Sequence, residues 1–156
     1  KNKWGIVMGL ISENQIKLDC CVHSKDELID LFIQLLDDAK KIKDKRQFKK
    51  DVYEREKIAN TAIGDEIAIP HALSTQVIDS SLVFIRLKDS IDWTDGDKVK
   101  YVFGIAVPKE NKDNQHLKIL STLARNLLNE EFKGKLLLSS SKTECYCILN
   151  GIISDN

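Results

Sequence analysis

The sequence predicts an α/β protein of mixed α+β type: a three-layer α/β/α sandwich in which helices flank a small mixed β-sheet. Apolar residues recur at helical spacing near both ends of the chain, and short apolar segments typical of strands lie between them. Helices on both sides of a strand cluster imply a sheet that is covered on both faces. No linker or shift in composition divides the chain, so we expect a single domain over residues 1–156.

Two helices are predicted before the main strands. Residues Ser24–Glu27 have the pattern of a capping box, in which a serine begins a helix and a glutamate follows three residues later. Apolar residues then recur at helical spacing over residues 28–39. A second helix is expected over residues 44–56, with Phe48 and Val52 on the side that faces the core.

The strands are expected in the middle of the chain. Residues 81–87 and 100–107 are rich in valine, isoleucine, phenylalanine and tyrosine, which favours two strong strands. Residues 67–69 have the pattern of a short buried strand, and residues 16–18 that of a weaker one. Residues 92–97 lie between the strong strands and are predicted to form a turn. Such a short connection indicates an antiparallel pair within a mixed sheet.

Three helices are predicted after the strands. Leucines at helical spacing over residues 117–128 indicate a long amphipathic helix. A short helix around residues 131–138 follows it. Residues Ser141–Glu144 repeat the capping-box pattern and begin a last helix, which we expect to stop at Gly151.

The charge balance and the hydropathy pattern argue against nucleic-acid binding and membrane insertion. The chain has 24 basic and 24 acidic residues, whereas nucleic-acid binding needs a dominant positive field. The basic cluster in residues 40–50 is followed by acidic residues, and we interpret it as a solvated helix face. The longest nearly apolar run, residues 4–11, is far too short to span a bilayer and lacks the basic leader of a signal peptide. We therefore expect a cytoplasmic protein.

The four cysteines form two closely spaced pairs. Cys20 and Cys21 are adjacent, and one residue separates Cys145 from Cys147. Neither spacing is that of a zinc ribbon or of a redox motif. We interpret all four as buried thiols in a reducing compartment.

Chemistry is expected to depend on the histidines, His23, His71 and His116, because no stereotyped catalytic motif is present. The sequence has no glycine-rich phosphate cradle, no G-x-S-x-G elbow and no H-E-x-x-H helix. His71 directly follows a short strand and Pro70, at a strand end of the kind that lines the functional crevice of α/β sheets. A neutral imidazole is a competent nucleophile near pH 7. Judged by this setting alone, a structural histidine is the commoner case.

A long motif connects Arg55 to His71. It runs from an Arg-Glu pair through a threonine and a glycine to Ala-Ile-Pro-His. This order resembles the active-site signature of the fructose/mannitol family of phosphotransferase-system (PTS) enzyme IIA domains, the EIIA type-2 family. The resemblance continues over nearly the whole chain: residues 12–19 are similar to the family's first segment, and residues 115–117 to its second histidine region.

The resemblance implies a cytoplasmic phosphocarrier of a bacterial sugar phosphotransferase system, an enzyme of the phosphotransferase class that forms a phosphohistidine and needs no cofactor or metal. The phosphorylated phosphocarrier protein HPr would dock, and one nitrogen of His71 would attack its phosphoryl group in line. The phosphoryl group would then pass to a cysteine or histidine of the EIIB component of a sugar permease. Positioning and neutralisation of the equatorial oxygens do most of the work in such transfers.

The resemblance also implies supporting residues. Arg55 would offer its planar charged fork to the phosphoryl oxygens, the alternative being an ordinary helix salt bridge. His116 would donate a hydrogen bond to the phosphoryl group or orient it, the alternative being a plain position in the first turn of a helix. Thr61 would bond to the oxygens or, as we favour, to local backbone. Asp65 would hold a ring or shape the pocket, and a turn residue is an equal alternative.

Two other interpretations use the same histidines. A regulatory IIA module, of the nitrogen-linked type or associated with a transcription regulator, would be phosphorylated on His71 but would signal rather than feed transport. A metal site on His71 and His116 is disfavoured because no motif places enough further ligands.

Overall fold

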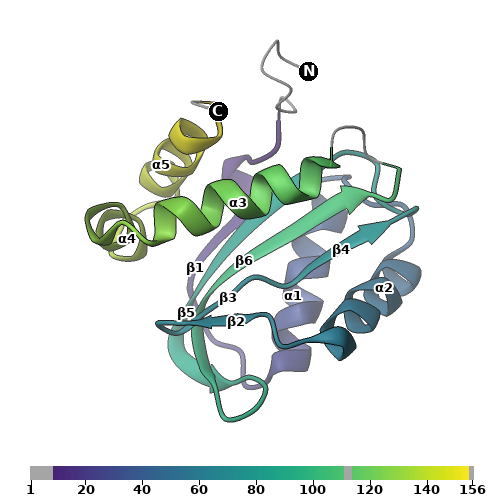
Figure 1. Ribbon diagram of the computed structural model, residues 1–156, viewed down its shortest axis with the longest axis horizontal. Coiled ribbons are helices and arrows are strands. Elements are labelled where there is room, and N and C mark those ends of the chain that lie inside the picture. The colour runs from purple at the N-terminus through teal and green to yellow at the C-terminus, as the bar shows by residue number, and fades with distance from the viewer. Residues whose placement is uncertain (1–8, 111–113, 155–156) are drawn as a thin grey trace.

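A computed structural model describes residues 9–110 and 114–154 of the chain, which fold around one mixed β-sheet (Figure 1). The strands are β1 (Ile16–Cys20), β2 (Ala62–Gly64), β3 (Ile67–Ala68), β4 (His71–Ser74), β5 (Ser81–Asp92) and β6 (Lys98–Pro108). The helices are α1 (Lys25–Asp38), α2 (Lys45–Ile58), α3 (Gln115–Leu127), α4 (Glu130–Leu137) and α5 (Lys142–Ser154), and a 3-10 turn, η1 (Glu13–Gln15), precedes β1.

The sheet is built around an antiparallel hairpin of the two long strands, β5 and β6. On one side β1 runs parallel to β5, and on the other β3 and β4 both run parallel to β6. β2 pairs antiparallel with β3 at the far edge. Helices α1 and α2 lie on one face of the sheet, and α3, α4 and α5 lie on the other (Figure 1). The mixed sheet and the three layers confirm the predicted fold class.

Each face of the sheet buries its own apolar core, because side chains alternate along the long strands. In the core against α1 and α2, the rings of Phe32 and Phe48 meet edge to face with their centroids 5.9 Å apart. In the core against α3 and α5, Phe84 and Phe103 stack with centroids 4.9 Å apart. The sheet is therefore fixed from both sides, and so is the edge that carries β3 and β4.

The predicted helix starts are confirmed at α1 and α5. Ser24 Oγ accepts a hydrogen bond from the backbone N–H of Glu27 at 3.1 Å, and Ser141 Oγ accepts one from Glu144 at 3.1 Å. Helix α2 begins after Asp44, whose carboxylate accepts hydrogen bonds from two backbone N–H groups of the first turn. Side-chain acceptors of this kind satisfy N–H groups that have no partner within the helix.

One long strand and the last helix extend beyond their predicted ends. β5 continues past Leu87 to Asp92. Its pairing with β6 shifts register between Arg86 and Ile91, and the exposed polar residues 88–90 lie at this irregularity within the strand. Helix α5 passes Gly151 instead of stopping there. A glycine inside a helix costs only about 1 kcal/mol, and Ile153 beyond it is buried in the core.

Local sequence patterns do not indicate the two short strands β2 and β4. β2 is only three residues long and mostly exposed, so it shows no apolar alternation. β4 directly follows Pro70, which breaks the pattern of a continuous strand. Both strands exist because of pairing to β3 and β6, and such long-range pairing is invisible in a local window.

The expectation of buried thiols is wrong for two of the cysteines. Cys145 is buried and Cys20 is half-buried, whereas Cys21 and Cys147 are exposed. Burial raises the pKa of the Cys145 thiol, which makes it less reactive. All four are free thiols.

The apolar run over residues 4–11 is only partly visible. Residues 4–8 lie outside the described residues, while Leu10 and Ile11 are buried in the core against α3 and α5. Within residues 9–110 and 114–154, every helix is too short or too polar to cross a membrane.

Gly104 in β6 makes room for the aromatic ring of α1. A Cβ atom at this position would lie 2.4 Å from two ring carbons of Phe32, a side chain that is fully buried. Real Cβ atoms do not approach other atoms so closely, so the ring or the strand would have to move.

We expect Gly104→Ala to destabilise the fold by about 1–3 kcal/mol, because overpacking in a dense core forces side chains out of their rotamers. The free energy of unfolding, measured by urea titration, checks this. Gly134→Ala in α4 is the matched control, since a Cβ there meets nothing within 4 Å. It should stabilise the protein by up to about 1 kcal/mol through helix propensity. Equal unfolding midpoints for the two variants would contradict the close packing of α1 on β6.

Candidate functional site

His71 lies where two short strands meet on the same partner. β3 pairs with β6 at Ala68, and β4 resumes the pairing with β6 at His71, opposite Ile105. Pro70 interrupts the ladder between them because it has no N–H, but its carbonyl accepts a hydrogen bond from Ile105 N at 3.0 Å. The chain therefore does not leave the sheet at His71, as the sequence suggests; it re-enters the sheet there, and the backbone on both sides of the ring is held.

The hydrogen bonds of the His71 ring define its tautomer. Nδ1 lies 2.8 Å from the carbonyl oxygen of Ile69, which can only accept, so Nδ1 carries the proton. The Nε–H of Arg55 points at Nε2 from 3.2 Å and donates to it. An atom that accepts a hydrogen bond has its lone pair available, so Nε2 is the nucleophilic nitrogen of the ring.

The surroundings keep His71 neutral. Burial of the ring is the largest cause that lowers its pKa, and the positive charge of Arg55 and the nearby His116 lower it further. The hydrogen bond to Ile69 and the carboxylate of Glu56 raise the pKa, but the net shift is downward from the ordinary value. The ring therefore stays unprotonated, and able to act as a nucleophile, at neutral pH.

Arg55 is held in place from the last turn of α2. Besides the bond from Nε to the ring, its Nη1 donates to the carbonyl oxygen of Ala59 at 3.0 Å. These two bonds orient the plane of the guanidinium beside Nε2. A permanently charged group in that position stabilises negative charge that develops next to the ring.

A shallow hollow of about 380 Å³ brings the main predicted site residues together. Helix α2 contributes Arg55, strand β4 contributes His71, and the first turn of α3 contributes His116. The other residues that line the hollow are Asp51, Glu54, Ile58, Ala72 and Leu73. Segments far apart in the sequence thus place one nucleophilic ring, one guanidinium and a second imidazole around a single opening.

The two weaker predicted site residues do not line this hollow. Thr61 is buried, and its hydroxyl donates to the carboxylate of Glu56 at 2.6 Å. Asp65 is exposed and forms an ion pair with Lys133 of α4 at 2.8 Å. Each makes a contact that supports local structure around the motif.

Glu56 is the residue of the motif to which sequence reasoning assigned no role. Only 4% of its side chain is exposed, and its carboxylate pairs with the ammonium of Lys25 at 2.8 Å. The signal that could have identified it is its position beside Arg55 in the Arg-Glu pair. A charged side chain next to a site residue is expected to face water, unless the fold brings a partner to it.

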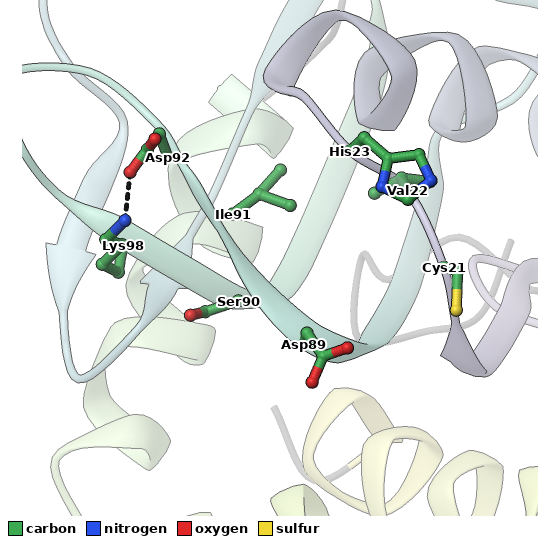
Figure 2. Close-up of a pocket in the computed structure, with 8 residues that line it drawn as sticks. All are labelled: Cys21, Val22, His23, Asp89, Ser90, Ile91, Asp92 and Lys98. Carbon is green, nitrogen blue, oxygen red and sulfur yellow. Dashed lines mark hydrogen bonds and ion pairs between the residues drawn. The ribbon is translucent and has the colours of Figure 1, made fainter.

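A separate hollow contains the third histidine. His23 lies with Cys21 and Val22 before α1, facing the stretch from Asp89 to Lys98 that includes the irregular part of β5 (Figure 2). In Figure 2 the Cys21 thiol, the His23 ring and the Asp89 carboxylate point in different directions, and the interaction drawn is the ion pair of Asp92 with Lys98. Among the residues that the structure describes, no three histidine, cysteine or carboxylate side chains come together as metal ligands would.

The sequence matches a family of known proteins over most of its length. Residues 9–151 fit the family described as "Phosphoenolpyruvate-dependent sugar phosphotransferase system, EIIA 2". A fructose-specific EIIABC component of this system from Bacillus subtilis is 36% identical over 143 residues, which are 90% of this chain but only 22% of that protein. The mannitol-specific enzyme IIA component of the same organism is 32% identical over 148 residues, 93% of this chain and 99% of that protein.

Solved structures show the same fold. The nitrogen regulatory protein IIA-Ntr from Neisseria meningitidis superposes with a TM-score of 0.81 and 29% identity, over 95% of this chain and 99% of that one. The mannitol IIA enzyme of Escherichia coli, in a complex with phosphorylated IIB, superposes with a TM-score of 0.76 over 90% of this chain and 97% of that one. Its identity is 22%, so this second likeness concerns the fold alone.

Proposed function

Because this chain belongs to the EIIA 2 family of the phosphoenolpyruvate-dependent sugar phosphotransferase system, we propose that it carries a phosphoryl group on Nε2 of His71. The observation that carries this proposal is the pair of contacts on the His71 ring. Nδ1 donates to a backbone carbonyl, and Nε2 faces the guanidinium of Arg55. The lone pair and the positive charge are therefore side by side, which suits an anion that forms a bond to nitrogen.

The reaction proceeds by two phosphoryl transfers. The lone pair of Nε2 attacks the phosphorus of phospho-HPr, the bond from phosphorus to the HPr nitrogen breaks, and the electron pair returns to that nitrogen. In the second transfer a nucleophile of EIIB attacks the same phosphorus, and the bond to Nε2 breaks. Little covalent chemistry is left to other residues, so alignment and charge stabilisation supply most of the rate.

Arg55 and His116 are the supporting residues in this mechanism. The Arg55 guanidinium neutralises the equatorial oxygens while the phosphoryl group moves on or off Nε2. His116 lines the same hollow from α3, and in this mechanism its ring hydrogen-bonds to the phosphoryl group or orients it. Thr61 and Asp65 support the surrounding backbone, a role consistent with their contacts to Glu56 and Lys133.

We propose HPr and an EIIB component as the protein partners, a single domain over residues 1–156, and the cytoplasm as the location. The EIIB partner is supported by the fold shared with a IIA enzyme that was solved with phosphorylated IIB. The cytoplasm is where the phosphorylated donor proteins of this pathway would have to meet the chain. The chain spans 22% of the fructose-specific EIIABC relative, so a covalently linked EIIB component is one form that this partner takes in the family.

Phosphotransfer in vitro tests the function. The protein is mixed with labelled phosphoenolpyruvate, enzyme I and HPr, and then with an EIIB protein of the fructose or mannitol type. We expect label that is labile in acid and stable in base, located by mass spectrometry on the peptide that contains His71, and then its transfer to EIIB. No uptake of label from phospho-HPr would contradict the proposed function.

The same experiment separates transport from regulation. A regulatory IIA module would accept the phosphoryl group on His71 with the same chemistry. The likeness to the nitrogen regulatory protein IIA-Ntr is the observation that favours this alternative. Fast onward transfer to EIIB supports the transport role, whereas phosphorylation without onward transfer to either type of EIIB supports the regulatory one.

A further inference from the structure

A chain of contacts connects the ion pair of Lys25 with the buried Glu56 carboxylate to the ring of His71. Glu56 Oε1 pairs with Lys25 Nζ at 2.8 Å, and Glu56 Oε2 accepts a hydrogen bond from Thr61 Oγ1 at 2.6 Å. The carbonyl of Thr61 accepts from the backbone N–H of Ile69 at 2.9 Å, and the carbonyl of Ile69 accepts from Nδ1 of His71 at 2.8 Å. Each step is a hydrogen bond or an ion pair of ordinary length.

The hairpin of β2 and β3 joins the Glu56 end of this chain of contacts to the His71 end. Figure 1 shows β2 following directly from the C-terminal end of α2, with β3 beside it. Ala62 of β2 pairs with Ala68 of β3, so Thr61 and Ile69 are the residues just outside the paired ends. The bond from Ile69 N to Thr61 O therefore closes the open end of the hairpin. The side chain of Thr61 holds that end to α2 through Glu56.

The ion pair is itself fixed by a third part of the fold. Lys25 Nζ donates to Thr94 Oγ1 at 2.6 Å and lies 4.7 Å from the centroid of the Trp93 ring, both in the turn between β5 and β6. Asn60 Nδ2 reaches the same turn and donates to the carbonyl of Thr94 at 3.2 Å. The Glu56 carboxylate thus pairs with a lysine of α1 that the β5–β6 turn holds in place, rather than with a residue of its own helix.

A contribution to the stability of the fold does not by itself explain the ion pair of Lys25 with Glu56. A buried ion pair contributes little net stability, because the cost of removing both charges from water offsets their attraction. The Glu56 carboxylate has a second effect that an apolar pair would lack: its negative charge favours positive charge on the His71 ring. The ring gains positive charge while Nε2 forms its bond to phosphorus, so this effect acts during the transfer.

We propose that Glu56 and Thr61 are positioning residues, which hold the His71 ring as the Nδ1–H tautomer through the backbone of Ile69 and so keep the Nε2 lone pair directed at the incoming phosphoryl group. This inference rests on the proposed phosphocarrier function. In this inference Thr61 acts on the His71 ring through its bonds to Glu56 and to the backbone of Ile69, and it does not contact the phosphoryl oxygens. The tautomer of the ring is open to measurement without any phosphotransfer.

The decisive comparison is Thr61→Val against Thr61→Ser. Valine has nearly the shape of threonine but lacks the hydroxyl that binds Glu56, whereas serine keeps that hydroxyl and leaves the Lys25–Glu56 pair intact. In Thr61→Val we expect a smaller Nδ1–H fraction for His71, measured from the ring ¹⁵N shifts by NMR. Phosphoryl uptake from HPr should slow by about 2- to 10-fold, the effect of one lost hydrogen bond. Thr61→Ser should restore both values to those of the wild type.

Glu56→Gln provides a second variant, and Asp30→Asn its control. Glu56→Gln removes the negative charge that raises the His71 pKa, so that pKa should fall further below its ordinary value in an NMR titration. Asp30 pairs with Lys49 at 2.7 Å and also bridges α1 and α2, but both side chains of this pair are half exposed or nearly so. Asp30→Asn should leave the tautomer, the His71 pKa and the transfer rate unchanged.

The outcomes separate the inference from the function. If Thr61→Val is less stable but keeps the wild-type tautomer and transfer rate, Thr61 is only structural and the inference is wrong. Equal losses in Thr61→Val and Thr61→Ser would also overturn it, because the hydroxyl would then not be the cause. If the wild-type protein accepts no phosphoryl group but the ring tautomer still responds to Thr61→Val and not to Thr61→Ser, the proposed function fails while the positioning role stands.

Discussion

Replacing His71 with alanine is expected to abolish phosphoryl uptake, with a loss of at least about a thousand-fold in rate. The reason is that, under the proposed function, Nε2 of His71 is the atom that forms the bond to phosphorus. Its ring is held between the Ile69 carbonyl and the Arg55 guanidinium, and its pKa is kept below the ordinary value. The measurement is incorporation of label from phosphoenolpyruvate through enzyme I and HPr.

His23→Ala is the matched control for this substitution. His23 is exposed and lies in the separate hollow before α1, so its loss should not change the rate of uptake. Both variants should unfold near the wild-type temperature, because neither ring lies in the apolar cores. Uptake of label by His71→Ala at the wild-type rate would mean that another residue accepts the phosphoryl group, and the assignment of His71 would then be wrong.

Replacing Arg55 with glutamine is expected to slow phosphoryl uptake by about 10²–10³-fold, which is the usual effect of removing one preorganised donor from developing charge. The variant keeps a polar side chain of similar length but lacks the permanent charge beside Nε2. The His71 pKa should rise in this variant, because the Arg55 charge is one of the causes that lower it. An NMR titration of the His71 ring measures this rise, and the labelling assay measures the rate.

Arg46→Gln, on the same helix, controls for the loss of a positive charge from α2. Arg46 is exposed, and its side chain lies outside the hollow that contains His71. A loss of rate in Arg46→Gln comparable to that in Arg55→Gln would mean that the general charge of α2 matters, for example in docking. A rate loss in Arg55→Gln without any change in the His71 pKa would argue against direct contact between the two side chains.

The candidate site could be predicted from the sequence because its main motif is nearly continuous. Arg55 and His71 are separated by one helix end and one short hairpin, so their order along the chain already resembles a family signature. His116 comes from a distant segment, and the sequence suggests it only through that resemblance. Glu56 carries no local signal for burial, since its partner Lys25 lies at the start of α1. An ion pair between distant segments cannot be read from either segment alone.

The sequence by itself determined the fold class, the main helices with their serine caps and the two long strands, and it predicted His71 as the phosphoryl acceptor. These features depend on periodicity, capping and motif order, which act over a few residues. Only the tertiary structure decided that the chain re-enters the sheet as β4 at His71, that Nδ1 carries the ring proton, and that Glu56 is buried. Each of these depends on a partner supplied by another part of the chain, and the partner exists only once the sheet and both helical layers have formed.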